Sequence, residues 1–253
     1  MAKRSPPLIA AQSFADNVFP TATAVFVGGS VLRGEGTPTS DLDTVVITTE
    51  PPAPYRETFL HAGWTVEAFV HSARTLSIWA DMDIAEGAPI LARLVTEGEI
   101  VRDIDGTATV LQRRMQQRMD TGPGEPTGEE LDALRYAITD TLDDLADSPH
   151  GLERQEFAAA LIQLLSRLYL MTRGEWSGKG KWLIRRIAHV DPELSSQMTE
   201  LTTTAINGAP TGLIELADEM LAPIGGRLLH GYRADGTAIM ERWLRGAGDP
   251  RYH

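Results

Sequence analysis

The sequence predicts two domains, an α/β (α+β) domain at the N-terminus and an α-helical bundle at the C-terminus. In the first half of the chain, short apolar segments alternate with glycine and proline turns, as expected for strands joined to helices. The stretch TGPGEPTGEE at 121–130 contains two prolines and three glycines and marks a loop. Beyond it, apolar residues recur at helical spacing. We therefore place the first domain at residues 1–121 and the second at 127–253.

The N-terminal domain is expected to begin with a helix at 6–19 that ends before Pro20. Apolar, β-branched and aromatic residues predict strands at 23–27, 42–48, 64–70 and, at an edge, 99–102. Gly28-Gly29-Ser30 forms a turn ahead of a short helix or loop, and 34–40 is a loop by its glycines, proline and hydroxyls. Further helices are expected at 55–62, 72–86, 88–97 and 105–119.

The C-terminal domain reads as helical throughout. We expect helices at about 128–147, 151–173, 179–189, 191–206, 210–222 and 226–246. Apolar residues are nearly continuous over 157–171, which predicts that this helix lies at the buried centre of the bundle.

Composition narrows the class of protein. Of 253 residues, 42% are hydrophobic and 23% charged, as in a globular protein, and there is no cysteine for disulfides or thiolate metal sites. No apolar run reaches the ~18 residues of a membrane span, so we expect no membrane partner and a cytoplasmic location. The net charge of −12 disfavours general nucleic-acid binding. It suits cationic small molecules, or anions delivered with a divalent metal.

Asp41 and Asp43 are the first candidate functional residues. Side chains at i and i+2 of a strand point the same way, so both carboxylates share one face and Leu42 takes the other. The Gly28-Gly29-Ser30 turn lies just upstream, where backbone N–H groups can hold a phosphate. An anion cradle beside paired carboxylates indicates metal-assisted chemistry on a nucleotide phosphate.

Glu67 is the third candidate. It lies in the strand expected at 64–70 and shares a face with Thr65 and Phe69. A lone carboxylate in an apolar strand is costly to bury without a partner. A metal ion held jointly with Asp41 and Asp43 would supply that partner.

Residues 23–70 resemble the nucleotidyltransferase superfamily, which has the polymerase-beta-like fold. The resemblance rests on Val27-Gly28-Gly29-Ser30, followed at the family's spacing by Ser40-Asp41-Leu42-Asp43-Thr44, and on Glu67 at the place of the third carboxylate. Thr44 departs from the family pattern, which has an apolar residue there.

The resemblance implies an N-terminal catalytic domain with a small mixed sheet. It also implies transfer of a nucleoside monophosphate from an NTP with two Mg²⁺ or Mn²⁺ ions, held by Asp41, Asp43 and Glu67. ATP is the expected donor, as the most frequent in the family. The implied nucleotide-binding residues are Gly28, Gly29, Ser30, Arg33 and Ser40.

A second group of charges lies at 176–186, WSGKGKWLIRR. Lys179 and Lys181 stand near the start of a predicted helix, where cations are unfavourable for the helix dipole unless an anion binds. The segment resembles, more loosely, the C-terminal domains of antibiotic-type nucleotidyltransferases, in which lysines reach the triphosphate. The alternative is a solvated basic helix face.

Acidic residues also mark the helical domain. Asp140, Asp143, Asp144 and Asp147 share one helix face, either as a solvated surface or as a subsite for a cationic acceptor such as an aminoglycoside. In the enzymes that this chain resembles, a helical-domain carboxylate accepts the proton of the acceptor hydroxyl. Glu153 is preferred here over Glu156 for that role.

The sequence thus predicts a nucleotidyltransferase that acts on an NTP and a small hydroxyl-bearing acceptor, with the active site in the cleft between the domains. One alternative acceptor is a protein side chain, and another is an RNA 3′ end, which the helix with Arg113, Arg114 and Arg118 would contact. A further alternative is a nucleotide-binding regulatory module without turnover. The intact carboxylates argue against that module.

Overall fold

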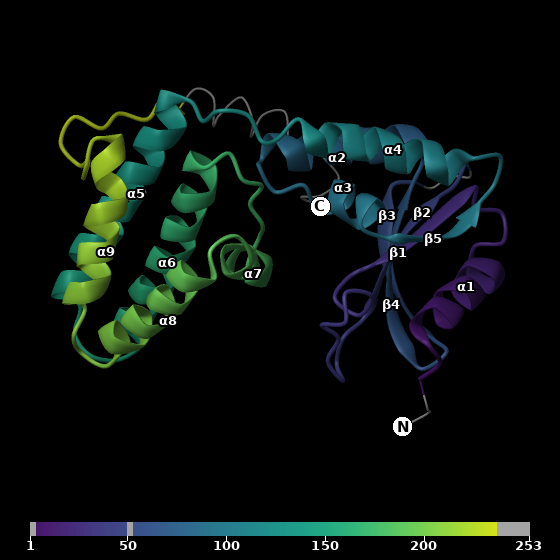
Figure 1. Ribbon diagram of the computed structural model, residues 1–253, viewed down its shortest axis with the longest axis horizontal. Coiled ribbons are helices and arrows are strands. Elements are labelled where there is room, and N and C mark those ends of the chain that lie inside the picture. Colours follow the sequence, from purple (N-terminus) through teal and green to yellow (C-terminus); the bar gives the residue numbers. More distant parts are fainter. Residues whose placement is uncertain (1–3, 50–52, 237–253) are drawn as a thin grey trace. The chain divides into compact units, whose positions relative to one another are not determined.

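The computed structural model describes residues 4–49 and 53–236. It divides into two compact units: unit 1 comprises Met1–Gly124 and Arg173–Trp182, and unit 2 comprises Glu125–Thr172 and Leu183–His253. The elements, labelled in Figure 1, are α1 Pro7–Val18, β1 Ala24–Gly28, β2 Leu42–Ile47, β3 Tyr55–His61, β4 Trp64–His71, α2 Ala73–Ala85, α3 Ile90–Thr96, β5 Glu99–Asp103, α4 Thr107–Asp120, α5 Gly128–Asp147, α6 Leu152–Thr172, α7 Lys181–Val190, α8 Pro192–Ile206, α9 Thr211–Leu221 and the 3₁₀ turn Ala222–Ile224.

Unit 1 is built on a five-stranded mixed sheet with the order β3-β4-β2-β1-β5. The central strand β2 pairs antiparallel with β1 and parallel with β4, while β3 and β5 close the two edges in antiparallel fashion. Every residue of β1 is buried, which agrees with its continuous apolar sequence. The α/β (α+β) fold class with a small mixed sheet is confirmed.

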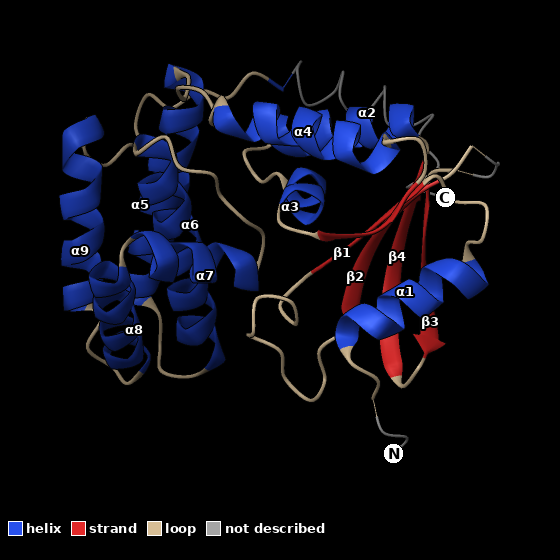
Figure 2. Cartoon of the chain, turned by 45° about the vertical axis from the view of Figure 1, so that its right-hand side comes forward, coloured by secondary structure: helices blue, strands red, loops and turns tan. Residues whose placement is uncertain are grey.

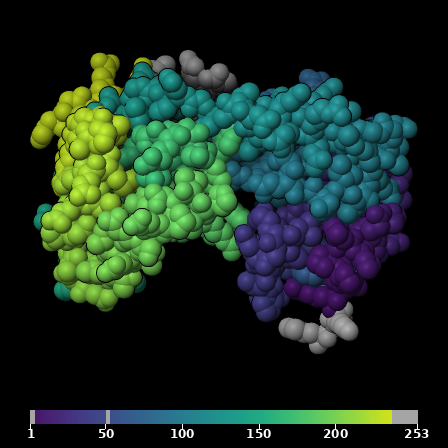
Figure 3. Space-filling view, in the orientation of Figure 1, coloured from purple at the N-terminus to yellow at the C-terminus, as the bar shows by residue number. Residues whose placement is uncertain are grey.

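The two faces of the sheet carry different helices, as Figure 2 shows. Helix α1 packs its alanines and Phe14 against Val25, Val27 and the inward residues of β4. Helices α2, α3 and α4 cover the opposite face, where Phe26, Val45 and Ile47 are buried. In the space-filling view, α1 and α4 form opposite surfaces of unit 1 (Figure 3). Period-two alternation along the strands assigns each side chain to one of these two layers.

The expected helix at 55–62 is wrong. Residues Tyr55–His61 form β3, which pairs with β4 along its whole length from Tyr55 opposite Val70 to His61 opposite Trp64. Ala62 and Gly63 both have positive φ and make the tight connection between the two strands. A seven-residue segment without a clear apolar period takes its conformation from the neighbouring strand.

The segment Arg173–Trp182 lies between two helices of the C-terminal half, yet it belongs to unit 1. Trp176 is buried, and its indole N–H donates to the carbonyl of Met119 at 3.0 Å. The backbone N–H of Ser177 donates to the carbonyl of Gly87 at 2.8 Å. The Lys179 ammonium pairs with Glu86 at 2.7 Å. We call this stretch the 173–182 segment.

Unit 2 is a helical bundle whose core combines residues from α5, α6, α7, α8 and α9. Its first helix begins at a capping box in which Thr127 and Glu130 satisfy each other's backbone N–H groups. Leu161, Leu165 and Leu168 of α6 are almost fully buried, as expected for the central helix. The helix expected at 226–246 is wrong over 226–235, which contain no helix; residue 236 is helical, and 237–246 lie outside the described residues.

Residues 225–232 instead return along α5. The Arg135 guanidinium donates to the carbonyls of Gly225 and Gly226, and the rings of Tyr136 and Tyr232 stack at 4.3 Å. These contacts satisfy backbone carbonyls that a helix would have paired internally. Within the described part of the chain, no helix combines the length and apolar character needed to span a membrane.

Candidate active site

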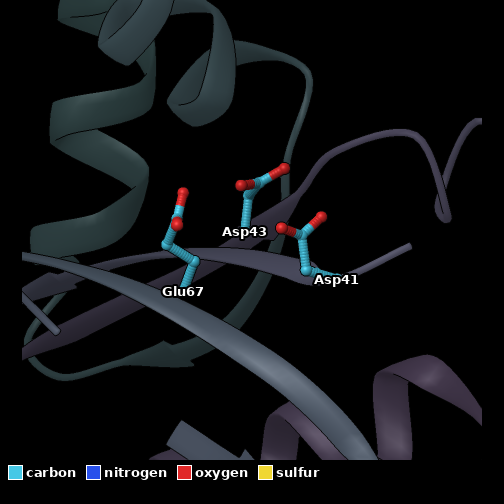
Figure 4. A group of neighbouring side chains, drawn as sticks. All are labelled: Asp41, Asp43 and Glu67. Carbon is cyan, nitrogen blue, oxygen red and sulfur yellow. The ribbon is translucent and has the colours of Figure 1, made fainter. Parts of the chain in front are cut away.

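Asp41, Asp43 and Glu67 are brought together by the pairing of two parallel strands. Asp43 of β2 lies opposite Glu67 of β4 in the register, and Asp41 lies two residues before Asp43 on the same side of the chain. One carboxylate oxygen from each residue lies within 4.8 Å of the other two. All three side chains extend to the same side of the sheet (Figure 4). Their separation is compatible with a shared divalent metal.

Thr44 has a structural role that explains its departure from the family pattern. It is fully buried, and its hydroxyl donates to the backbone carbonyl of Glu67 at 3.1 Å. A buried hydroxyl that is hydrogen-bonded carries little penalty compared with an unsatisfied one. Thr44 therefore ties the two carboxylate-bearing strands together.

The Gly28-Gly29-Ser30 turn packs directly against the carboxylates. Gly29 has φ +92°, and a Cβ atom at this position would collide with Oδ2 of Asp43. Glycine is therefore required by both backbone conformation and space. Residues 30–34 form turns, so the loop alternative holds and there is no short helix after this turn. Any phosphate bound here would meet turn amides and side chains, without a helix N-terminus.

The electrostatics of the site raise the pKa of Asp43 from 3.8 to about 6. Burial is the largest cause, followed by the negative charges of Asp41 and Glu67. The positive charges of Lys181 and Arg33 act in the opposite direction. Lys181 reaches this environment because the 173–182 segment packs on unit 1.

Arg56 is a site residue that the sequence did not indicate. Its guanidinium forms an ion pair with Oε1 of Glu67 and lies 5.2 Å from the centre of the Phe69 ring. Glu67 thus has the partner that a carboxylate in an apolar strand requires, and in this structure the partner is an arginine. Because 55–62 was expected to be a helix, no residue of a neighbouring strand was available as an alternative.

The predicted nucleotide-binding residues of the N-terminal half all lie at the end of β1 or in the connection between β1 and β2. The Ser40 hydroxyl accepts from the backbone N–H of Thr37 at 2.8 Å and lies 3.5 Å from the Ser30 hydroxyl. Arg33 pairs with Glu97 at 3.2 Å and lies 4.8 Å from the centre of the Trp182 ring. Arg33 is therefore held in place by residues from two distant parts of the sequence.

The two lysines of the 173–182 segment differ in their surroundings. Lys179 is paired with Glu86, whereas the Lys181 ammonium lies 5.5 Å from the centre of the Trp182 ring and affects Asp43. Both side chains are exposed. Trp182 contacts both Arg33 and Lys181 through its π face.

The acidic candidates of the helical half all belong to unit 2. Glu153 and Glu156 are exposed near the start of α6, and their role as general base stays a prediction. The four aspartates of α5 are exposed as expected from their spacing, and Asp143 pairs with Arg227 at 3.3 Å.

Two further candidates lie in unit 1. Arg118 of α4 pairs with Asp81, while Arg113 and Arg114 are exposed. His71 is the buried last residue of β4, where burial lowers its pKa to about 4. It stands four residues beyond Glu67 and contacts Trp79 edge to face, so it serves the core.

Comparison with known proteins identifies a family for the part of the chain that carries the three carboxylates. Residues 14–105 match the model of the nucleotidyltransferase domain family. No curated protein matches the chain. A nucleotidyltransferase-like protein from Exiguobacterium sibiricum 255-15, solved as a crystal structure, aligns with 14% identity and a TM-score of 0.43, covering 95% of this chain and 80% of that one. The predicted superfamily is confirmed for residues 14–105, which form a nucleotidyltransferase domain carrying Asp41, Asp43 and Glu67.

Proposed function

We propose that this protein is a metal-dependent nucleotidyltransferase that moves AMP from ATP to a hydroxyl of a small, aminoglycoside-like acceptor and releases pyrophosphate. The observation that carries the proposal is the placement of Asp41, Asp43 and Glu67, whose carboxylate oxygens lie within 4.8 Å of one another inside the nucleotidyltransferase domain.

The three carboxylates fit Mg²⁺ or Mn²⁺. Both ions prefer hard oxygen ligands, and this group offers oxygens without nitrogen or sulfur. Burial and, after it, the negative charges of Asp41 and Glu67 raise the pKa of Asp43, and a divalent cation would offset that clustered charge. Two such ions, held by Asp41, Asp43 and Glu67, would supply activation of the attacking oxygen and charge stabilisation of the leaving pyrophosphate.

The chain's own residues would bind and orient the nucleotide. The Gly28-Gly29-Ser30 turn lies beside Asp43 and offers backbone N–H groups to the β- and γ-phosphates. Lys181 and Arg33 bring positive charge to the same neighbourhood, since both lower the pKa of Asp43. Ser30 and Ser40 add hydroxyl groups to this cradle, and Lys179 adds a further cation on the 173–182 segment.

Glu153 is the proposed general base that accepts the proton of the acceptor hydroxyl. It is exposed in the first turn of α6, where its carboxylate is accessible to a substrate. Glu153→Gln should reduce turnover by about a hundredfold. Glu156→Gln, a charge-matched change one turn away, should leave turnover nearly unchanged. The reverse pattern would assign the role to Glu156.

A cationic acceptor is supported by charge. The chain has a net charge of −12, and the aspartates of α5 give unit 2 an acidic helix face. An acidic surface raises the local concentration of a polyamine-like molecule and repels polyanions. The same argument disfavours an RNA 3′ end as acceptor.

The decisive experiment combines calorimetric titration of ATP, with and without Mg²⁺, with a pyrophosphate-release assay over small-molecule, protein and RNA acceptors. We expect Mg²⁺-dependent ATP binding and release stimulated by a polyamino polyol. Release that depends on RNA or on a protein would overturn the small-molecule acceptor. Tight ATP binding without release on any acceptor would favour a regulatory module.

A further inference from the structure

Arg56 occupies a position that the proposed function does not explain. It lies on the edge strand β3, directly opposite Phe69 in the register, while Thr58 lies opposite Glu67. Its guanidinium therefore reaches diagonally across the pair of strands to Glu67, with the Phe69 ring 5.2 Å away. The diagonal reach places a fixed positive charge at the edge of the carboxylate group.

The three carboxylates differ in their partners. Glu67 is paired with Arg56, whereas Asp41 and Asp43 have no Lys or Arg within ion-pair distance among residues 4–49 and 53–236. Glu67 is also the less exposed partner in its pair, with 17% of its side chain accessible against 60% for Arg56.

A divalent cation bound by all three carboxylates would stand close to this guanidinium. The two cations would repel each other and would compete for the electron density of the same carboxylate. Arg56 can yield without disrupting the fold, because its side chain is mostly exposed and emerges from an edge strand. The aromatic face of Phe69 offers the guanidinium an alternative contact.

We propose that Arg56 is a resident counter-ion of Glu67 that competes with the divalent metal and thereby sets the metal affinity of the site. The inference rests on the proposed function, since it takes Asp41, Asp43 and Glu67 to be the metal ligands. Arg56 acts through Glu67 and is in this sense a positioning residue.

The test is calorimetric titration of Mn²⁺ into the full-length wild type, Arg56→Gln, Arg56→Lys and Arg74→Gln. Arg74 is exposed at the start of α2, so its replacement removes the same charge away from the carboxylates. Arg56→Gln should bind Mn²⁺ about fivefold more tightly, the affinity equivalent of one exposed ion pair. Arg56→Lys and Arg74→Gln should stay close to the wild type.

Other outcomes would overturn the inference or its premise separately. Unchanged or weaker Mn²⁺ binding by Arg56→Gln, with a wild type whose binding is lost in Asp41→Asn/Asp43→Asn, contradicts the competition alone. Equal tightening in Arg74→Gln reduces the effect to general charge and also contradicts it. If neither the wild type nor Arg56→Gln binds Mn²⁺ through the carboxylates, both the inference and the proposed function fail.

Discussion

The carboxylates and the lysines of the candidate site are held in different ways. Asp43 and Glu67 sit on adjacent strands of the sheet, and their approach follows from strand register and alternation. Lys181 lies on the 173–182 segment, which reaches unit 1 only after the chain has built α5 and α6. Its place depends on contacts of the segment with unit 1. Trp176 is anchored to α4, and Ser177 and Lys179 are anchored to the turn after α2.

This difference predicts that the two halves of the site can be disabled independently. The carboxylates belong to the core of unit 1, so their geometry persists as long as the sheet is folded. The lysines depend on a few contacts of one segment, which can detach while the sheet remains intact. Metal binding and nucleotide binding should therefore respond to different substitutions.

The largest expected effect is on the carboxylate side. Asp41→Asn/Asp43→Asn should lower nucleotidyl transfer at least about a thousandfold, because the proposed metal ligands are lost. The fold should persist, with an unchanged far-ultraviolet circular dichroism spectrum. Asp105→Asn is a suitable control, since Asp105 is exposed and has φ +54°, a conformation that asparagine tolerates. Wild-type turnover in the double variant would refute the assignment.

The next largest effect is expected for the lysines of the 173–182 segment. Trp176→Ala removes a side chain that is 7% exposed, and should lower the free energy of unfolding by about 3 kcal/mol. ATP affinity should fall because Lys179 and Lys181 lose their anchoring, while Mn²⁺ affinity should stay within about twofold of the wild type. Denaturant unfolding and calorimetry measure both.

Trp176→Phe is the matched variant for that experiment. It keeps an aromatic ring but loses the N–H donor to Met119 and part of the buried ring volume, so about 2 kcal/mol should be lost. Parallel loss of ATP and Mn²⁺ affinity in Trp176→Ala would show that the two sides are coupled.

The pH dependence of stability tests the environment of Asp43 among the carboxylates. The folded protein raises the pKa of Asp43 from 3.8 to about 6, so the native state holds a proton that the unfolded state has released between these values. Stability should therefore fall as pH rises from about 4 to about 6 in metal-free protein, by about 3 kcal/mol from this group, and level off above.

The groups that face Asp43 and set this slope are Asp41, Glu67, Lys181 and Arg33. Asp43→Asn should remove most of the slope and raise the melting temperature at pH 8 without metal. The comparison of urea unfolding at pH 4.5 and pH 8 for both proteins measures it. An identical slope in the variant would contradict the assigned cause.

The smallest effect separates backbone strain from crowding at the turn. Gly29→Ala combines a positive φ with a collision at Asp43, and should cost about 2 kcal/mol and weaken Mn²⁺ binding. Gly34→Ala has a similar φ of +77° and nothing within 4 Å of the added Cβ, so it should cost about 1 kcal/mol and leave Mn²⁺ binding unchanged. Equal metal affinity in both variants would rule out crowding of the carboxylate.

Much of unit 1 was accessible from local patterns. The alternation of β4 placed Glu67 on the same face as Phe69, and the spacing of Asp41 and Asp43 placed those two carboxylates on one face. Their approach to Glu67 follows from the parallel register of β2 and β4, which no local pattern gives. The helix prediction for 55–62 was wrong because pairing with β4, and not the segment's own composition, determines its conformation. Arg56 was missed for the same reason.

The position of the two lysines could be predicted from the sequence only in part. Lys179 and Lys181 were selected from a dipole argument, but the anchoring by Trp176 to Met119 spans 57 residues of sequence. No local period predicts such a contact. The local sequence offers one indication of this anchoring, which is a tryptophan within a glycine-rich connection between two helices, EWSGKGKW.

The path of the chain also determines what recombination between related genes would exchange. It leaves unit 1 after Gly124, returns at Arg173 and leaves again after Trp182. A single recombination event downstream of residue 124 would exchange the helices and, with them, the lysines proposed to meet the triphosphate. Donor and acceptor preference would then change together, so a chimera that keeps the original donor needs residues 173–182 grafted back onto the new helical half.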